Sequence, residues 1–499
     1  MIDINEISNK FWNIADLLRD TVDTQEVMDI ILSLLMLKKF DSELLKQNNR
    51  ICDAWDEYTR NNMSPNAKET LICANFNVKY FNHSKIRFNN LMSDSGKIIK
   101  NTNLYINSFS SNIKEIFDEQ HLNLLHFINK LDPKMLEGLI DKIININIDG
   151  ADTQDIGDIF EELLRRFSED TAKKAGAFYT PRDIVKLLVK ILVSNLKDEE
   201  MKTVYDCACG TGGILNGCYK ELKDKVDAVE LYGQEKNSKT WAIAKGEMEM
   251  QEIEGEIANG NTLTDDKITG KLFDYIGANP PFGVKWEQES KQINKNEERY
   301  NKGLPSIDDG QLLFDMTCLF KLNNVGRAVI IHNLSPLFKG KVSSGESQIR
   351  KFILENDFLE CVVLLPNDLF FNTNIPTCML IYSRKKEEKR KNKLQIINAS
   401  KIFTKLAKAL NKKQVELSND NVELILKEYI DFKETDISKI IDIDEFKQVD
   451  DKGTVGYKIE YNKYFPIDEE EFEPPEVIFE RILQKKAELD ESFKELLSI

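Results

Sequence analysis

Thr203-Val-Tyr-Asp-Cys-Ala-Cys-Gly-Thr-Gly-Gly-Ile-Leu215 is the stretch that decides the fold. A short apolar run passes into small residues and three glycines, and an apolar helical pattern resumes from Ile214. This order predicts a strand, a glycine-rich turn and a helix N-terminus, where backbone N–H groups can approach a ligand closely. Glycine suits such a turn because a Cβ would obstruct it or collide with the ligand. Taken alone, the stretch also fits a turn with a purely structural role.

A second strand-and-turn pattern lies downstream, at Phe273-Asp-Tyr-Ile-Gly-Ala-Asn-Pro-Pro-Phe-Gly283. Two prolines cannot continue a hydrogen-bonded ladder, so the turn from Asn279 to Phe282 is held away from the sheet. A side-chain amide, a carbonyl and an aromatic face then meet at the carboxyl end of a strand, where open α/β sheets bind ligands. An Asn-Pro turn beside a core phenylalanine is the structural alternative. The two patterns in this order favour a ligand site.

Together these motifs resemble those of the DNA methyltransferases that methylate amino groups with S-adenosylmethionine. The motifs are Asp206-Cys-Ala-Cys-Gly-Thr-Gly-Gly213 and Asn279-Pro-Pro-Phe282, and Phe178-Tyr-Thr-Pro181 upstream looks like the additional cofactor-side motif of that class. Their order is that of the class in which the cofactor motif precedes the catalytic one. The whole chain looks like the modification subunit of a type I restriction–modification system, an adenine-N6 methyltransferase.

The resemblance implies an α/β fold of the Rossmann-like, S-adenosylmethionine-dependent methyltransferase type, with a mostly parallel sheet, an N-terminal helical domain and a C-terminal helical extension. We expect the domains at residues 1–150, 151–400 and 401–499. Apolar residues at helical spacing in 11–19 and 27–40 fit the first, which in the family clamps DNA and meets the specificity subunit. Residues 46–125 show no clear pattern. From about residue 401 we expect charged helical segments.

The resemblance also assigns the site. The catalytic residues would be Asn279, Pro280, Pro281 and Phe282. The cofactor-binding residues would be Ala177, Phe178, Tyr179, Thr180, Pro181, Arg182, Asp206, Ala208, Gly210, Thr211, Gly212, Gly213, Glu235 and Asn261. An acid at the end of the second strand, here Glu235, can accept hydrogen bonds from ribose hydroxyls. Asn261 stands where the family usually has Asp, and its carbonyl can still accept from the cofactor's adenine amino group.

The chemistry implied is direct displacement. The lone pair of an exocyclic adenine nitrogen is delocalised into the ring, so the nitrogen is a poor nucleophile. If the Asn279 side-chain oxygen and the Pro280 carbonyl accept its protons, its lone pair points at the sulfonium methyl, and positioning and electrostatics carry the rate. The target base must leave the duplex, and Phe282 offers it a stacking face.

Composition limits the remaining choices. The chain has 499 residues, a length that predicts more than one domain. Of these residues 41% are hydrophobic and 30% charged, which is an ordinary balance for a globular protein. No apolar run is long enough for a bilayer and the first residues are acidic, which indicates a cytoplasmic protein without a membrane partner. Eight scattered cysteines predict reduced thiols, and four dispersed histidines give no support for a metal site.

A net charge of −16 is unusual for a DNA enzyme, because non-specific DNA affinity comes mainly from cationic contacts with phosphate. Either a basic patch is therefore segregated on one face, or a partner supplies much of the affinity for DNA. The resemblance implies double-stranded DNA, a specificity subunit that binds two modification subunits, and a restriction and translocation subunit as partners. No Walker-type motif appears, so ATP-driven activities belong elsewhere. The near-heptad apolar positions after Pro474 predict a helix that binds a partner or packs back on its own domain. The resemblance implies that this partner is the specificity subunit.

Two further features remain open on the sequence alone. Residues 284–310 are polar and follow the catalytic turn directly, so they are a candidate lid or DNA-contact loop that becomes ordered on binding. The target class also has alternatives, because Asn-Pro-Pro-Phe resembles the Asn-Pro-Pro-Tyr of protein glutamine methyltransferases. A methyltransferase for protein or RNA, and a cofactor-binding scaffold without turnover, are the alternative functions.

Overall fold

The computed structural model describes residues 3–18, 22–44, 48–93, 95–148, 153–170, 180–198, 200–371, 373–410 and 412–465, together with Phe479 and Lys485. The chain divides into two compact units, Met1–Ile459 and Glu460–Ile499. The helix predicted after Pro474 lies outside the described residues, apart from Phe479 and Lys485. None of the described helices is both long enough and apolar enough to cross a membrane.

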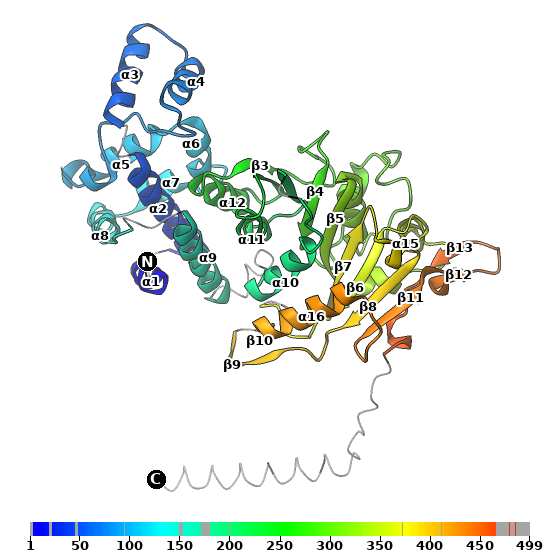
Figure 1. Cartoon of the computed structure of the whole chain (residues 1–499). Helices are drawn as coiled ribbons and strands as arrows, with labels where there is room; N and C mark the ends of the chain where they lie inside the picture. Colours follow the sequence, from blue (N-terminus) through cyan, green and yellow to red (C-terminus); the bar gives the residue numbers. More distant parts are fainter. Residues whose placement is uncertain are drawn as a thin grey trace. The chain divides into compact units, whose positions relative to one another are not determined.

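The N-terminal region is helical, as the apolar periodicity predicts (Figure 1). Its helices are α1 (Ile4–Leu18), α2 (Thr24–Leu44), α3 (Asn48–Arg60), α4 (Pro65–Phe76), α5 (Ile98–Asn107), α6 (Ser111–Phe117), α7 (Leu124–Lys130), α8 (Pro133–Ile144) and α9 (Thr153–Asp170). The irregular stretch from residue 46 onward thus contains helices as well. Local caps fix two of them: Ser64 and Asp132 accept backbone N–H groups, and a proline follows each at the first helical position.

A nine-stranded sheet forms the core of the remaining part. Its strands are β1 (Lys202–Asp206), β2 (Val229–Glu235), β3 (Glu254–Asn259), β4 (Phe273–Ala278), β5 (Leu322–Asn333), β6 (Leu359–Leu364), β7 (Thr377–Ser383), β8 (Lys393–Asn398) and β11 (Ser438–Asp442). The order is β11-β8-β6-β7-β5-β4-β1-β2-β3. Five neighbouring pairs are parallel, whereas β7 runs antiparallel to β5 and β6, and β11 antiparallel to β8. The mostly parallel sheet is confirmed.

Helices connect and cover these strands. They are α10 (Arg182–Leu192), α11 (Gly213–Leu222), α12 (Ser238–Met250), α13 (Gln311–Lys321), α14 (Ser335–Phe338), α15 (Gly345–Glu355) and α16 (Asn419–Asp431). Strands β1 to β3 progress in one direction from β1, and the chain then returns to place β4 on the other side of β1. This reversal is a topological switch point, where open α/β sheets bind ligands beyond the carboxyl ends of their strands.

The N-terminal helices pack on the catalytic part through α12. Asp29 of α2, whose side chain is 0% exposed, forms an ion pair with Lys239 of α12 at 2.6 Å. Glu115 and Lys245 form another pair at 3.1 Å. The ring of His121 lies 4.3 Å from that of Trp241. Because α12 begins directly after β2, these contacts reach the element next to the carboxyl edge of the sheet.

Residues 401–457 differ from the expected helical segments. They contain β9 (Thr404–Leu410), β10 (Lys413–Glu416), β11, β12 (Lys447–Val449) and β13 (Val455–Tyr457), with α16 as the helix among them. β9 pairs with β10, β12 pairs with β13, and β11 is the edge strand of the main sheet. Strand pairing overrides the helix propensity of this charged stretch, since local propensity is a weak prior against tertiary context.

Residues 284–310 are the polar segment that follows the catalytic turn. This segment carries a hydrophobic cluster of its own, in which Trp286, Ile293 and Tyr300 pack with Leu263 and Leu313. The Tyr300 hydroxyl donates to the Leu263 carbonyl at 2.8 Å. The segment therefore has a small hydrophobic core of its own, because scattered aromatic residues in a polar sequence suffice to form one.

Candidate active site

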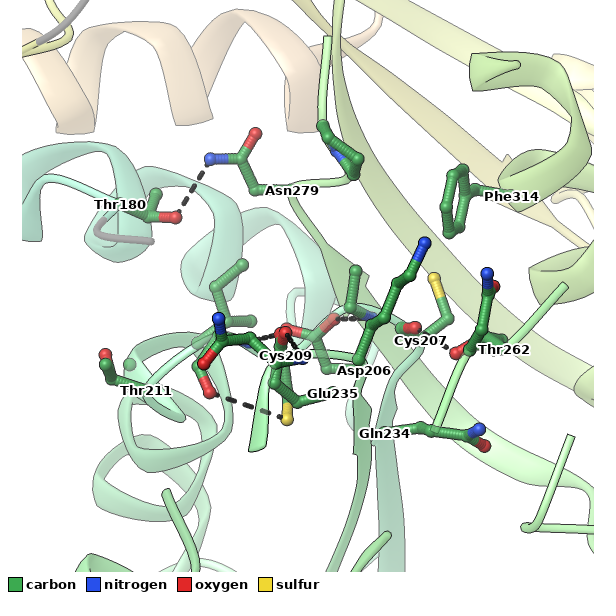
Figure 2. Close-up of a pocket in the computed structure, with 18 of the residues that line it drawn as sticks. Thr180, Asp206, Cys207, Cys209, Thr211, Gln234, Glu235, Thr262, Asn279 and Phe314 are labelled. Atoms are coloured by element: carbon green, nitrogen blue, oxygen red, sulfur yellow. Dashed lines mark hydrogen bonds between the residues drawn. The ribbon is translucent and has the colours of Figure 1, made fainter. Parts of the chain in front are cut away.

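A cavity at the carboxyl edge of the sheet has a volume of about 440 Å³ (Figure 2). Its wall consists of Thr180, Asp206, Cys207, Ala208, Cys209, Gly210, Thr211, Gly213, Ile214, Gln234, Glu235, Lys236, Asn237, Gly260, Asn261, Thr262, Asn279, Pro281 and Phe314. The ends of β1, β2 and β4 contribute most of these residues, together with the loop after β3. A cavity of a few hundred Å³ suits one small organic ligand.

The glycine-rich turn after β1 forms one wall of the cavity. Gly210 and Gly212 have φ values of 56° and 88°, in the left-handed region that favours glycine. The backbone N–H of Cys209 donates to the Gln234 carbonyl at 3.1 Å, which ties the turn to β2. A Cβ on Gly213 would meet nothing within 4 Å. The turn therefore leaves open space beside the first residues of α11, as its sequence predicts.

Glu235 closes the end of β2 and holds this turn in place. One carboxylate oxygen accepts from the Gly210 N–H at 3.0 Å, and the other accepts from the Asn237 N–H at 2.7 Å. Burial raises the pKa of Glu235, and these backbone N–H groups offset part of the effect. The carboxylate thus has a structural role besides any contact with a ligand.

Asp206 lies at the end of β1 and is 1% exposed. Its carboxyl accepts from the Ala208 N–H at 3.0 Å. Burial raises the pKa of Asp206 to about 8, although the Ala208 N–H lowers it, and the neighbouring Glu235 raises it further. Two buried carboxyl groups with raised pKa values are stabilised by a cation between or beside them. These two carboxyl groups therefore fit a positively charged ligand such as S-adenosylmethionine, which carries an ammonium and a sulfonium group.

Asn279 follows β4, and its side chain is oriented by Thr180. The Asn279 Nδ2 donates to the Thr180 Oγ1 at 2.9 Å, and Figure 2 shows the amide nitrogen turned toward that hydroxyl. The Asn279 Oδ1 is buried and accepts no hydrogen bond from any residue that the structure describes. An unpaired buried carbonyl oxygen is costly, so it marks a position where a ligand donor fits.

The rest of the catalytic turn is arranged around this amide. Within the described part of the chain, no donor reaches the Pro280 carbonyl. Pro281 lines the cavity. Phe282 packs edge to face on Phe370, with the ring centroids 5.7 Å apart. The turn therefore offers two acceptors and an aromatic ring within four consecutive residues.

The other predicted cofactor residues are distributed as follows. Ala208, Thr211 and Asn261 line the cavity. Pro181 caps α10, and Arg182 donates to the Asp158 carbonyl at 3.4 Å beside a neighbouring cavity. Gly212 is the N-cap of α11 and lies outside the main cavity wall. Ala177, Phe178 and Tyr179 lie outside the described residues.

Several residues of the wall were not identified from the sequence. Phe314 comes from α13 and faces the end of the cavity formed by Cys207 and Thr262 (Figure 2). The Thr262 hydroxyl donates to the Cys207 carbonyl at 2.6 Å and thereby joins the loop after β3 to the glycine turn. Lys236 follows Glu235 directly. The position next to a motif was a usable signal for Lys236 and Thr262, whereas nothing in the sequence marks Phe314.

No group of three or more His, Cys, Asp or Glu side chains placed to hold a metal occurs in the part of the chain that the structure describes. The eight cysteines are unpaired thiols. The wall of the cavity offers carboxyl groups, amides, hydroxyls, thiols and backbone groups. With its sheet order and switch-point cavity, the fold is that of a methyltransferase. The chain belongs to the N-6 DNA Methylase family, whose model matches residues 151–466, and residues 7–143 match the HsdM N-terminal domain.

Curated relatives agree with this family. The chain is 30% identical to the type I restriction enzyme MjaVII methylase subunit of Methanocaldococcus jannaschii over 408 residues, which cover 79% of this chain and 66%, just under two thirds, of the relative. It is 26% identical to the MpnII methylase subunit of Mycoplasma pneumoniae, over 91% of this chain and 89% of that one. A type I methyltransferase subunit from Streptococcus thermophilus shares the fold, with a TM-score of 0.72, 22% identity and coverage of 89% and 97%.

These matches identify the chain as an adenine-specific DNA methyltransferase of the type I modification-subunit kind. The predicted family, fold and activity are confirmed. Membership of this family also implies that S-adenosylmethionine is the methyl donor.

Proposed function

We propose that this chain methylates N6 of an adenine flipped out of duplex DNA, with Asn279 and Pro280 as the acceptors that prepare the nitrogen. The observation that carries the proposal is the Asn279 Oδ1, which is buried and unpaired while the other end of the amide is bonded to Thr180. A buried acceptor without a donor is stabilised when a substrate N–H reaches it.

The two acceptors act on the geometry of the nucleophile. The amino group of adenine has two N–H bonds, and one can point to the Asn279 oxygen while the other points to the Pro280 carbonyl. Accepting both pulls the nitrogen out of conjugation with the ring, so its lone pair becomes available. S-Adenosylmethionine supplies the methyl group from its sulfonium centre. The protein contributes position and electrostatic complementarity, and it forms no covalent bond to the base.

The methyl donor, S-adenosylmethionine, would be held by residues at or after the carboxyl ends of β1, β2 and β3. Asp206 suits the ammonium group, because burial disfavours the ionised form of its carboxyl and a cation beside it would stabilise that form. Glu235 can accept from the ribose hydroxyls while it keeps its bonds to Gly210 and Asn237. The nucleobase would then extend toward Asn261 and Phe314, at the end of the cavity away from Asn279.

The base and the DNA need further contacts. Phe282 would stack on the flipped adenine, since base–aromatic stacking contributes about 1–3 kcal/mol. The net charge of −16 argues that a specificity subunit supplies most of the DNA affinity and the sequence readout. We infer docking of that subunit on residues 474–499, with two modification subunits per specificity subunit.

Transfer of labelled methyl from S-adenosylmethionine to duplex DNA tests the proposal. The chain would be assayed alone and with its specificity subunit, on DNA that contains adenine and on the same duplex with N6-methyladenine at the target. We expect S-adenosylmethionine binding by the chain alone and efficient, adenine-dependent transfer by the complex. Donor binding without transfer to DNA in any combination would leave only a cofactor-binding scaffold, and transfer to protein or RNA instead would reassign the substrate.

A further inference from the structure

The loop after β3 makes a contact that the proposed mechanism does not use. Glu289 belongs to a short 3-10 helix, η3 (Glu289–Lys291), within the folded segment 284–310. Its Oε1 accepts from the Asn261 Nδ2 at 2.9 Å and from the Lys236 Nζ at 2.9 Å. Both partners line the cavity at the carboxyl edge of the sheet, in which the methyl donor would bind and which is called the donor cavity below. The Glu289 side chain is 14% exposed, whereas that of Lys236 is 68% exposed.

We propose that Glu289 is a positioning residue that fixes which end of the Asn261 amide faces the donor cavity, and thereby makes the site read an amino group on the donor's nucleobase. The proposal rests on the proposed function, in which the nucleobase lies toward Asn261. It adds a residue that determines donor specificity and does not touch the donor.

The argument begins with the shape of an amide. The oxygen and NH₂ ends of an asparagine side chain are nearly the same size, so only their hydrogen-bond partners decide the orientation. An ionised carboxylate can only accept, so the Asn261 NH₂ must face Glu289. The Asn261 Oδ1 accepts from the Leu263 N–H at 3.1 Å, and a carbonyl oxygen retains a second lone pair. The amide therefore presents an acceptor, and its complement on a purine is an exocyclic amino group.

Lys236 keeps Glu289 in the acceptor-only state. Burial by itself would raise the pKa of Glu289, but the hydrogen bond from Lys236, the Glu289 backbone N–H and the Asn261 amide lower it. The carboxylate thus stays ionised at neutral pH. A protonated or amide side chain at the same place could donate to Asn261, and the Leu263 N–H alone would then favour the present orientation of the Asn261 amide.

The test compares two nucleosides that differ at position 6 of the purine and in the proton that the oxo form carries on N1. S-Adenosylhomocysteine carries an exocyclic amino group, and its deaminated analogue S-inosylhomocysteine carries a carbonyl there. Their affinities for the purified full chain are measured by calorimetry. We expect the natural chain to prefer the amino form by at least about tenfold, because a carbonyl facing the Asn261 oxygen loses a hydrogen bond and leaves two acceptors opposed.

Glu289→Gln keeps the shape of the side chain and removes its acceptor-only character, so the preference should fall to roughly threefold or less. The matched control is Glu287→Gln in the same segment, whose side chain is 68% exposed and bonded only to Lys291 at 3.4 Å, and it should retain the full preference. In the double variant Asn261→Asp with Glu289→Gln, the acceptor-only group moves to position 261 and the new amide can donate to it. This variant should recover the preference.

The outcomes separate the two hypotheses. An undiminished preference in Glu289→Gln, or no recovery in the double variant, overturns the role of Glu289 and leaves the proposed function intact. Equal affinity of the natural chain for both nucleosides also overturns it, because the nucleobase is then not read at Asn261. Failure of the natural chain to bind either nucleoside overturns the proposed function and the inference together. Thermal unfolding of each variant checks that a lost preference is not a lost fold.

Discussion

The Asn279 side-chain amide donates to the Thr180 hydroxyl at 2.9 Å, and its own oxygen is buried without a donor. Thr180 precedes α10 and Asn279 follows β4, so residues 99 positions apart in the sequence set the direction of one carbonyl. Leaving a buried acceptor unpaired costs about 1–3 kcal/mol. A substrate N–H that donates to this oxygen would remove the cost, so the unpaired acceptor favours a substrate with an amino group.

Asn279→Ala should reduce methylation of DNA on the order of a hundredfold or more while leaving donor affinity nearly unchanged, because in the proposed mechanism the amide contacts the acceptor nitrogen. Thr180→Val should give a smaller loss, since the amide remains but its orientation is no longer fixed, and Thr180→Ser should be close to the natural protein. Single-turnover methylation and calorimetry with S-adenosylhomocysteine measure the two properties. A fall in donor affinity that matches the fall in rate would mean that Asn279 holds the donor instead.

Glu235→Ala should weaken donor binding by roughly 1.5–3 kcal/mol, the usual range for a hydrogen bond to a charged group. The loss has two sources, because the carboxylate also fastens Gly210 and Asn237. Glu230→Ala is the matched control, since Glu230 lies on the same strand and contacts Tyr232 outside the cavity wall. Unchanged calorimetric affinity in Glu235→Ala would show that other groups hold the ribose.

Asp206 should make both stability and donor binding depend on pH. Burial raises its pKa from an ordinary value near 3.8 to about 8, so the native chain keeps a proton that the unfolded chain releases. This carboxyl therefore lowers the free energy of unfolding as pH rises from about 4 to about 8, and no further above that. Asp206→Asn lacks the effect, so the variant should gain stability over the natural protein across this window, measured by denaturant unfolding.

The same carboxyl should release its proton when the donor's ammonium group binds. Calorimetry at pH 7 in buffers with different ionisation enthalpies should therefore detect net proton release in the natural protein and less release in Asp206→Asn. Donor affinity should be lower in the variant at every pH. A variant with undiminished affinity would place the ammonium group elsewhere.

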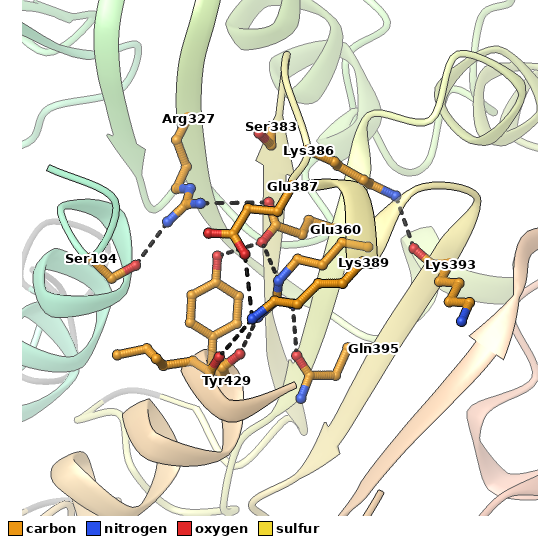
Figure 3. A network of polar contacts seen from close by, with 12 residues as sticks. Ser194, Arg327, Glu360, Ser383, Lys386, Glu387, Lys389, Lys393, Gln395 and Tyr429 are labelled. Atoms are coloured by element: carbon orange, nitrogen blue, oxygen red, sulfur yellow. Dashed lines mark hydrogen bonds and ion pairs between the residues drawn. The ribbon is translucent and has the colours of Figure 1, made fainter. Parts of the chain in front are cut away.

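A buried polar network fastens α16 to the sheet (Figure 3). Glu360, which is 2% exposed, pairs with Arg390 at 3.2 Å and with Arg327 at 3.6 Å, and it accepts from the Tyr429 hydroxyl of α16 at 2.9 Å. Glu360→Gln leaves two buried guanidinium groups without their counter-charge and should cost on the order of 3 kcal/mol of unfolding free energy. Glu388→Gln, at an 87% exposed side chain, should cost little. Equal unfolding midpoints for the two variants would contradict this role.

Deleting residues 474–499 should abolish assembly with the specificity subunit and leave donor binding intact. The reason is that the cavity and its supporting strands lie within the unit that ends at Ile459. Size-exclusion chromatography with light scattering measures assembly, and calorimetry measures donor binding. A truncated chain that still assembles would move the docking surface to another part of the molecule.

The part of the fold that the sequence predicts best lies between Lys202 and Gly283. β1 and β4 are short, largely apolar runs, and the turn after each has glycine or proline where the backbone requires it, so local chemistry is sufficient there. Thr404-Lys-Leu-Ala-Lys-Ala-Leu410 shows the opposite case. It consists largely of good helix formers and yet forms β9, because pairing with β10 outweighs its intrinsic preference.

The residues of the site also differ in whether local sequence is enough to predict them. Asp206, Glu235 and Asn279 were predicted because each lies at the end of a recognisable strand, at a position to which the family resemblance assigns a role. Phe314 and Glu289 were missed because they enter the site from α13 and from the segment 284–310, whose positions depend on packing between distant parts of the chain. The orientation of the Asn279 amide also requires Thr180, and no local pattern could supply that partner.

The Asp29–Lys239 ion pair limits how freely such subunits can exchange parts. The Asp29 carboxylate is fully enclosed and belongs to α2, whereas Lys239 belongs to the first turn of α12, four residues after Glu235. A chimera that takes its N-terminal helices from one relative and its catalytic part from another would lose this counter-charge unless it keeps a matching acid and base at these two positions. Recombination between related genes should therefore preserve the pair as a unit, even where the surrounding sequence diverges.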